Sequence, residues 1–496
     1  MKYTLAIDQS TSATKVLLFD ENETLKADVS VEHKQYYPEP GWVEHDPEEI
    51  IRNLDAACRQ VLFVSKVKPH EVSSIAVTNQ RETVVVWNAE TGKPVYNAIV
   101  WQCQRGAGFC AKLREQGLSD KVRKKTGLLI DPYFSASGLK WILDNVEGVR
   151  EMADHGLLKM GTMDSWIIWN LTKSDSLVHA TDYTNASRTL LFNINNLDWD
   201  DELLEIFTVP RSMLPEVRVC DTVFGNTDLN GLLPKNVPIA GVLGDSHAAL
   251  FGQMCFEPGM GKATYGTGSS VMVNTGLKPC IPPDGLVTSI GYAACGDIFY
   301  AFEGNIHCTG DTIKWLVNNL GLISTSSESE QWAVNAKDNN GVYFVPAFAG
   351  LGAPWWDNDA RAVICGMSRG SSKKHIVRAA LEAIAYQVKD LIDLMSEKSE
   401  VKLKELRVDG GPVKNGFLMQ FQADMLNAPI NRNQVKEASA YGAVLMNALA
   451  LGRRKSLSDL KSLIAESDIL APDMSAENRR VLYEGWKKAV SRATLK

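Results

Sequence analysis

Two short turns rich in glycine and hydroxyl side chains, far apart in the chain, constrain its fold most. The first runs through Ile7–Lys15 and the second through Thr264–Ser270. Each precedes an apolar run, Val16–Phe19 or Val271–Val273, so each is predicted to join the two strands of a hairpin. A tight turn of small residues directs several backbone N–H groups into one concavity, where they can bind phosphate. Two such turns facing each other across a cleft would hold a nucleotide from both sides.

The length of 496 residues favours two large domains over one core. Both halves show the same plan, in which a hairpin with a phosphate-type turn is followed by strands and helices. The sequence therefore predicts a duplicated α/β fold with a boundary near residue 250, giving domains 1–250 and 251–496. Because no linker rich in proline or serine marks that boundary, we expect the domains to pack closely along a hinge.

Local patterns predict several elements that can be checked against a structure. Asp46 is placed to cap a helix that has Pro47 at its first position and Glu49 three residues after the cap. An apolar stripe with four- and three-residue spacing predicts a long helix over 375–395. The predicted strands are Tyr3–Ile7, Lys15–Phe19, Thr24–Val31, Ser74–Thr78 and Val84–Trp87.

Composition and missing motifs exclude several classes of protein. A net charge of −7 without any block of lysine and arginine argues against nucleic acid or an anionic membrane as partner. Nine cysteines without a Cys-x-x-Cys pair indicate reduced thiols and a cytoplasmic location. The most apolar stretch, 237–252, contains Asp245 and His247 and is not expected to insert in a membrane. P-loop, Rossmann and His-Glu-x-x-His motifs are absent from the sequence.

Two aspartates each allow a structural and a chemical interpretation. Asp245 follows the apolar run Val237–Leu243 and precedes a short apolar helix, so it could be a helix cap or the general base of phosphoryl transfer. Asp8 ends the first predicted strand, where it could stabilise an Asx turn or bind Mg²⁺. Lys15 could be a solvated strand residue or could neutralise a phosphate.

Three further segments are open to the same two interpretations. Adjacent unlike charges, as in Asn79–Thr83, are typical of surface loops, but Arg81 and Glu82 could also bind the hydroxyls of a polyol. Trp101 and Tyr133 could be core residues or apolar walls against a carbon chain. The segment Val408–Gly416 could be a tight strand-to-helix turn or a backbone approach to a nucleotide, whose anion a helix N-terminus favours.

The order of these motifs and the residues around them resemble the FGGY carbohydrate kinases, and within that family the glycerol kinases. The resemblance extends almost from end to end. It rests on Asn79–Thr83, Tyr96–Gln102, Thr181–Thr189, Tyr265–Gly268, Phe348–Pro354, Ala362–Glu382 and Leu406–Asp424. It implies a duplicated actin/hexokinase-like (ribonuclease H-like) two-domain fold with an interdomain cleft. The implied activity is transfer of the γ-phosphoryl group of ATP, with Mg²⁺, to a terminal hydroxyl of glycerol or a similar polyol.

The resemblance also implies roles for individual residues. Asp245 is the expected base, and Asp8 and Asp245 are the expected metal ligands. The family's acceptor positions fall on Arg81, Glu82, Trp101, Tyr133, Asp245 and Ser246. Its nucleotide positions fall on Thr11, Ser12, Lys15, Thr267, Gly310, Lys314, Gly411 and Asn415. We further expect a homodimer or homotetramer.

Several residues depart from the family pattern. Ser246 and Ser270 stand where larger side chains are usual, and Cys103 and Lys314 also differ. Smaller, polar side chains near the acceptor would widen its pocket, so a four- or five-carbon polyol or a ketose is an alternative acceptor. A non-catalytic sensor of sugar or nucleotide is a second alternative, and an ATPase acting on protein partners is a third. The predicted acceptor set of Arg81, Glu82 and Tyr133 speaks against the third.

Overall fold

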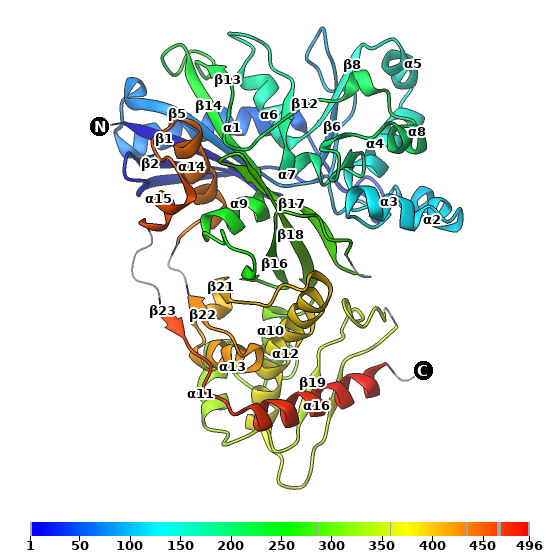
Figure 1. The fold of residues 1–496 in the computed structure, drawn as a ribbon, viewed down its shortest axis with the longest axis vertical. Helices are drawn as coiled ribbons and strands as arrows, with labels where there is room; N and C mark the ends of the chain where they lie inside the picture. Colours follow the sequence, from blue (N-terminus) through cyan, green and yellow to red (C-terminus); the bar gives the residue numbers. More distant parts are fainter. Residues whose placement is uncertain (1, 283–284, 358, 433–434, 464–467, 495–496) are drawn as a thin grey trace.

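A central mixed sheet organises each of two domains in the computed structural model, which describes residues 2–282, 285–357, 359–432, 435–463 and 468–494 (Figure 1). The first sheet has the strand order β13 (Val223–Thr227), β14 (Val237–Gly244), β5 (Val72–Asn79), β1 (Tyr3–Gln9), β2 (Ala13–Asp20) and β3 (Leu25–Glu32). The second has the order β17 (Val287–Ala294), β18 (Asp297–Ile306), β16 (Ser269–Gly276), β15 (Met260–Tyr265), β21 (Glu405–Gly410), β22 (Ile430–Arg432) and β23 (Asp468–Leu470).

The two sheets repeat one topology. In the first, β1 pairs antiparallel with β2 and parallel with β5. In the second, β15 pairs antiparallel with β16 and parallel with β21. The two glycine- and hydroxyl-rich turns connect β1 to β2 and β15 to β16, so they occupy equivalent places in the two domains. The predicted duplication and both predicted hairpins are thus confirmed.

Helices and short strands complete the domains. The helices are α1 (Pro47–Ser65), α2 (Ala107–Glu115), α3 (Ser119–Thr126), α4 (Ser135–Asn145), α5 (Val149–Asp154), α6 (Met163–Leu171), α7 (Tyr183–Ala186), α8 (Asp201–Phe207), α9 (Asp245–Gly252), α10 (Gly310–Asn318), α11 (Glu328–Val334), α12 (Lys373–Ser399), α13 (Gly416–Leu426), α14 (Ala438–Ala450), α15 (Leu457–Lys461) and α16 (Ala476–Ala493). A four-stranded sheet contains β4 (Glu44–His45), β7 (Ala98–Ile99), β6 (Val84–Asn88) and β8 (Leu158–Thr162). Three two-stranded pairs are β9 (Ala180–Asp182) with β12 (Glu216–Arg218), β10 (Phe192–Asn193) with β11 (Asp198–Trp199), and β19 (Tyr343–Val345) with β20 (Val363–Cys365).

Helix α14 lies against the first sheet although it comes late in the chain. It packs on α9 and on strands β14, β5 and β1, and Figure 1 draws it in orange beside them. The two helix backbones approach closely, because a Cβ built on Gly442 would lie 1.8 Å from the carbonyl oxygen of Ala248. The chain therefore passes between the domains more than once, and the single boundary near residue 250 stays a prediction.

The predicted helices are present with small differences at their ends. Asp46 caps α1 by accepting a hydrogen bond from the Glu48 N–H at 2.8 Å. Glu49 does not complete a capping box with the N–H of Asp46, because its carboxylate accepts a hydrogen bond from the N–H of Lys34 at 3.1 Å. Helix α12 is longer than its predicted 375–395 span, since the apolar stripe marks only the part of the helix that faces the core.

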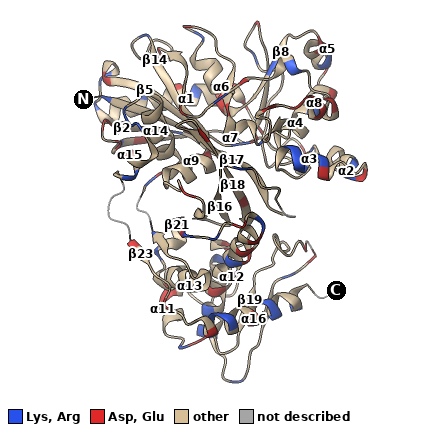
Figure 2. Ribbon diagram, in the orientation of Figure 1, with Lys and Arg blue, Asp and Glu red and all other residues tan. Residues whose placement is uncertain are grey.

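Each domain has its own buried core, and charge is spread between them. One core cluster lies around the first sheet, with Ile7, Ile75 and Trp87 among its members, and another lies around α12 and the second sheet. Acidic and basic residues are interspersed over both domains (Figure 2). Within the described residues, no helix is both long and apolar enough to cross a membrane.

Candidate active site

Asp245 stands where a strand of the first sheet ends and a short helix begins. Strand β14 ends at Gly244, and Asp245 is the first residue of α9. Gly244 holds the N-cap position, so Asp245 is not the cap residue, and its Oδ1 accepts a hydrogen bond from the N–H of Ser246 at 2.5 Å. The Asp245 Oδ1 lies 3.1 Å from the Arg81 Nε, and the Asp245 side chain keeps 37 % of its surface exposed. A carboxylate thus remains open to solvent beside a buried cation.

The segment Asn79–Thr83 is buried and is not a surface loop. It begins at the last residue of β5, and Arg81 and Glu82 are only 5 % and 2 % exposed. Glu82 has a φ of +62°, an uncommon conformation for a residue with a side chain, which indicates local strain. Its carboxylate accepts a hydrogen bond from the Arg188 Nε at 2.5 Å. The polyol interpretation of this segment is the one that its burial favours.

Glu303 completes this cluster and was missed at the sequence level, as was the role of Arg188. From β18 of the second sheet, Glu303 accepts two hydrogen bonds from the Arg81 guanidinium, both at 2.8 Å, and lies 3.0 Å from the Arg188 Nη1. Burial acts to raise the pKa of Glu303, but Arg188 and Arg81 outweigh it and hold that pKa well below its usual range. The available signal was a lone carboxylate ending the apolar run Phe299–Phe302.

Two aromatic side chains lie beside this cluster. The Trp101 and Tyr133 rings contact edge to face at 5.3 Å, and the Arg188 guanidinium lies 5.9 Å from the Tyr133 ring centre. Burial, followed by the charge of Glu82, raises the pKa of the Tyr133 hydroxyl. The indole N–H of Trp101 donates to the Thr11 hydroxyl at 2.9 Å. Trp101 therefore connects the candidate acceptor site to the first turn.

The first turn also reaches the Asp245 region through Asp8 and Lys15. These two residues are cross-strand partners in the β1–β2 hairpin. The pKa of Asp8 is raised to about 7, mainly by burial and next by the charge of Asp245, while Lys15 acts in the opposite direction. The Lys15 ammonium pairs with Glu437, the residue before α14, at 2.8 Å. Ser12 is exposed at the tip of the turn.

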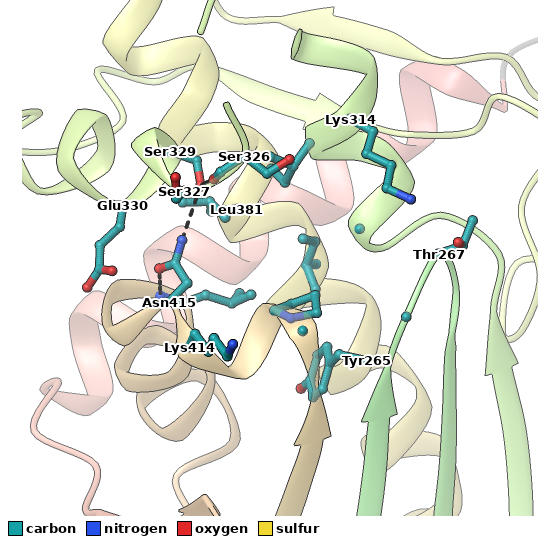
Figure 3. Close-up of a pocket in the computed structure, with 17 residues that line it drawn as sticks. Tyr265, Thr267, Lys314, Ser326, Ser327, Ser329, Glu330, Leu381, Lys414 and Asn415 are labelled. Atoms are coloured by element: carbon teal, nitrogen blue, oxygen red, sulfur yellow. Dashed lines mark hydrogen bonds between the residues drawn. The ribbon is translucent and has the colours of Figure 1, made fainter. Parts of the chain in front are cut away.

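A cavity of about 470 Å³ lies behind the second turn in the second domain. Five of the predicted nucleotide residues line it: Thr267, Gly310, Lys314, Gly411 and Asn415. Figure 3 shows Thr267 and Lys314 on one side of it and Asn415 on the other, where the Asn415 amide donates to the Ser329 hydroxyl at 3.2 Å. Ile313, Leu381 and Leu418 supply apolar surface. Such a cavity, largely apolar with a polar rim, has the size and chemistry for a nucleoside.

Thr11, Ser12 and Lys15 do not line that cavity, but a smaller one leads toward them. It measures about 290 Å³, and its lining includes Thr264, Asp409, Gly410 and Glu437. Thr264 begins the second turn, and Glu437 pairs with Lys15 of the first turn, so this space lies next to the second turn and one contact away from the first. A nucleotide seated in the larger cavity could extend its phosphates into the smaller one, toward Asp245.

The residues that depart from the family pattern have different settings. Ser246 is half-buried beside Asp245 on α9. The Ser270 hydroxyl accepts from the buried Lys262 ammonium at 3.4 Å. Cys103 is buried, and its sulfur accepts from the Arg105 Nε at 3.0 Å. Of the three, only Ser246 adjoins the candidate base directly.

The acidic residues suit a magnesium ion that keeps most of its own ligands. Within the described residues, no group of three or more His, Cys, Asp or Glu side chains is arranged to hold a metal. Asp8 and Asp245 are nevertheless close enough for each other's charge to matter, and a cation between them would relieve that repulsion. Mg²⁺ is usually bound by one or two carboxylates together with waters and substrate phosphates. The donor set present here fits that pattern.

Comparisons with known proteins agree with this geometry. Models of the FGGY family of carbohydrate kinases match residues 3–252 with the N-terminal domain and 261–451 with the C-terminal domain. Glycerol kinase 1 of Thermotoga maritima is 54 % identical over 98 % of this chain and 99 % of that protein. The crystal structure of Plasmodium falciparum glycerol kinase with ADP superposes with a TM-score of 0.95 at 38 % identity, covering 100 % of this chain and 99 % of that one. A xylulose kinase from Lactobacillus acidophilus, 22 % identical with a TM-score of 0.88 and coverages of 100 % and 99 %, shares the fold.

Proposed function

This chain belongs to the FGGY family of carbohydrate kinases, and we propose that it transfers the γ-phosphoryl group of ATP to a terminal hydroxyl of glycerol. It is a phosphotransferase with an alcohol as acceptor. The single observation that carries the assignment of roles is the carboxylate of Asp245, open to solvent at the start of α9 and 3.1 Å from the buried Arg81. A base at this position adjoins the candidate acceptor cluster, and its helix α9 borders the smaller cavity through Ala249.

We propose that the acceptor lies over Arg81 and Glu82, against Trp101 and Tyr133. Both terminal nitrogens of the Arg81 guanidinium donate hydrogen bonds to Glu303, and the remaining nitrogen, Nε, faces Asp245. The Nε lies 3.1 Å from the Asp245 carboxylate, so a hydroxyl bound to Asp245 would also lie beside this buried cation. Hydrogen bonds that involve a charged group are stronger than those between neutral groups, which would stabilise the acceptor there.

The proposed chemical step is an in-line displacement at phosphorus. Asp245 accepts the proton of the terminal hydroxyl as that oxygen bonds to the γ-phosphorus, and the bond from the γ-phosphorus to the β–γ bridging oxygen breaks, which releases ADP. Backbone N–H groups of the turns and Lys15 stabilise the charge on the phosphates. Asp8 and Asp245 would hold Mg²⁺, which supplies charge neutralisation when bound. Closure of the domains would exclude water as a competing acceptor.

We also propose a location and an oligomeric state for the protein. All nine cysteines are free, which suits a reducing cytoplasm. Six are buried, Cys280 and Cys365 are half-buried, and Cys295 is exposed. We propose a homodimer or homotetramer there, acting on a small polyol and ATP.

The experiment is a coupled assay of ADP release by the purified full chain with ATP and Mg²⁺. Acceptors would be glycerol, a four-carbon polyol, a five-carbon polyol and a ketopentose, with a reaction lacking acceptor as the control. We expect glycerol to give the highest kcat/KM and EDTA to abolish turnover. A higher kcat/KM for a five-carbon acceptor would replace glycerol by a larger substrate, as the small Ser246 side chain would allow. No acceptor-dependent release at all would overturn the proposed function.

A further inference from the structure

A buried aspartate at the start of α7 organises side chains that the proposed mechanism does not use. Asp182 is the N-cap of α7, and its carboxylate accepts from the Thr184 N–H at 2.7 Å and from the Asn185 N–H at 3.1 Å. It also accepts from the Thr184 hydroxyl at 2.6 Å and the Asn185 side-chain amide at 2.7 Å. These three residues, called here the α7 bracket, are completely buried. Their side chains are therefore fixed in position by Asp182.

Thr184 connects the bracket to the strand end that carries Asp245. Its hydroxyl donates to Asp182 and accepts from the N–H of Gly244 at 2.9 Å. Gly244 is the last residue of β14, immediately before Asp245. The stem of Arg81 crosses this point, because a Cβ built on Gly244 would lie 2.5 Å from the Arg81 Cγ. A shift of Gly244 would therefore move both Asp245 and its neighbour Arg81.

Asn185 connects the bracket to the strand end that carries Arg81. The Asn185 and Asn79 side-chain amides exchange two hydrogen bonds, both at 3.0 Å. Asn79 is the last residue of β5, two positions before Arg81, and it is the register partner of Gly244. Beyond this pair the two segments diverge, because a loop follows Asn79 whereas α9 begins directly after Gly244. The bracket thus closes the end of the β5–β14 pair at the point where the site begins.

The residues that follow the bracket reach the second domain. The Ser187 hydroxyl accepts from the Ile290 N–H of β17 at 3.3 Å, and Arg188 pairs with Glu303 of β18. Figure 1 shows α7 at the centre of the molecule, next to these strands. One short segment therefore contacts every element that contributes to the acceptor cluster described above, apart from the aromatic walls.

We propose that Asp182 is a positioning residue, which acts through Thr184 and Asn185 to fix the ends of β5 and β14 and so the placement of Arg81 relative to Asp245. This inference rests on the proposed kinase function. It assigns a role in that function to residues outside the proposed glycerol and ATP sites. Small displacements of reacting groups can cost about 100-fold in rate, so loss of a single bracket hydrogen bond should reach the chemistry.

A second buried carboxylate in the same region provides a matched control. Asp164, on α6, accepts from the hydroxyls of Thr162 at 2.5 Å and Thr181 at 2.6 Å. Its pKa is raised to about 7, mainly by burial and next by the charge of Asp182, so the two carboxylates share one environment. Thr181 is as buried as Thr184 and also donates to an aspartate, but it is not bonded to the end of β14. Thr184→Val and Thr181→Val are therefore the same chemical change in similar surroundings. Only Thr184 is hydrogen-bonded to the end of β14, next to Asp245.

The test compares these two variants by steady-state kinetics with glycerol and ATP, alongside thermal unfolding. For Thr184→Val we expect kcat to fall about 10-fold or more with the KM for ATP within about 2-fold of the unmodified chain. For Thr181→Val we expect kcat within about 2-fold, whatever its effect on the melting temperature. Asp182→Asn and Asp164→Asn form a second pair with the same expected contrast.

Equal kinetics of Thr184→Val and Thr181→Val, at any melting temperature, would overturn the positioning role. So would a loss of kcat in both that follows their loss of stability. Failure of the kinase function itself is separate, because it would leave the unmodified chain without glycerol-dependent ADP release.

Discussion

At the residue scale, the site consists of one open carboxylate beside a buried set of charges. Arg81, Arg188, Glu82 and Glu303 form two cations and two anions that neutralise one another. Asp245 is the fifth charge and remains partly exposed. The buried four give the acceptor a rigid surface, while the exposed one is free to take a proton.

The first prediction concerns the base itself. Asp245→Asn keeps the size of the side chain but cannot accept the proton, so kcat should fall by at least about 100-fold, the lower range for general base catalysis. Nucleotide binding, measured by calorimetry with ADP, should stay within a few-fold because the nucleoside cavity is untouched. A variant that retains near-normal turnover would refute the assignment. Asp201→Asn, which changes an exposed carboxylate on α8 outside the site, is the control and should keep most of the kcat.

The second prediction concerns Glu303. Glu303→Gln removes one negative charge facing Arg81 and Arg188, and breaking a buried ion pair commonly costs about 3–5 kcal/mol. We expect a clear fall in the free energy of unfolding, measured by chemical denaturation, together with a higher KM for glycerol. Glu405→Gln is a control on the same sheet, since its arginine pair is nearer the surface. An unchanged KM for glycerol would remove Glu303 from the acceptor site.

At the element scale, helix α12 is joined to α16 by a buried aspartate. Asp390 accepts hydrogen bonds from the Tyr483 hydroxyl at 2.5 Å and from the indoles of Trp486 and Trp355 at 2.9 and 3.1 Å. Burial raises the pKa of Asp390 to about 6 despite these donors. The folded protein therefore binds a proton at Asp390 that the unfolded chain has released between about pH 4 and 6.

The third prediction follows from the sign of this shift. Because the folded state holds the extra proton, the contribution of Asp390 to stability is present at low pH and is lost as the pH rises through about 6. A pKa of about 6 in place of the ordinary 3.8 corresponds to roughly 3 kcal/mol. The difference in unfolding free energy between the unmodified chain and Asp390→Asn should therefore change by up to this amount between pH 4.5 and 7. A difference that does not vary with pH would contradict the assignment.

Elements with a local signal were the most predictable from sequence. The hairpins around the two turns and the Asp46 cap depend on residues close together in the chain, and all are present. The burial of Arg81 was not predictable in that way, because its partner Glu303 is 222 residues away in another sheet. The packing of α14 on the first sheet has the same cause, since no local pattern records which domain a helix joins. Whether each site residue acts as expected stays a prediction.

At the scale of the whole molecule, one ion pair joins the first turn to the segment that returns from the second domain. Lys15 and Glu437 are about one third exposed, so their pair is expected to contribute only about 0–1 kcal/mol. Such a weak contact can be given up when phosphate binds. It holds Lys15 near the smaller cavity, which Glu437 lines, without fixing it there.

The fourth prediction tests this arrangement. Glu437→Gln should free Lys15 for phosphate and tighten ATP binding by up to about 5-fold, the equivalent of 1 kcal/mol. Lys15→Met should weaken ATP binding and remove the effect of Glu437→Gln in the double variant. Calorimetry with ATP and Mg²⁺ provides the measurement. Independent, additive effects of the two substitutions would show that Glu437 does not act through Lys15. Unchanged ATP binding in Lys15→Met would show that Lys15 does not bind phosphate.

In the proposed reaction, the acceptor and the terminal phosphate meet at Asp245, between two turns from two domains. The most direct measurement is a crystal structure of the full chain with glycerol, Mg²⁺ and a non-hydrolysable ATP analogue. We predict a terminal glycerol oxygen about 2.6–3.2 Å from the Asp245 carboxylate, facing the last phosphorus, with both turns around the phosphates. Glycerol bound away from Arg81 and Asp245, or phosphates contacting only one of the two turns, would contradict it.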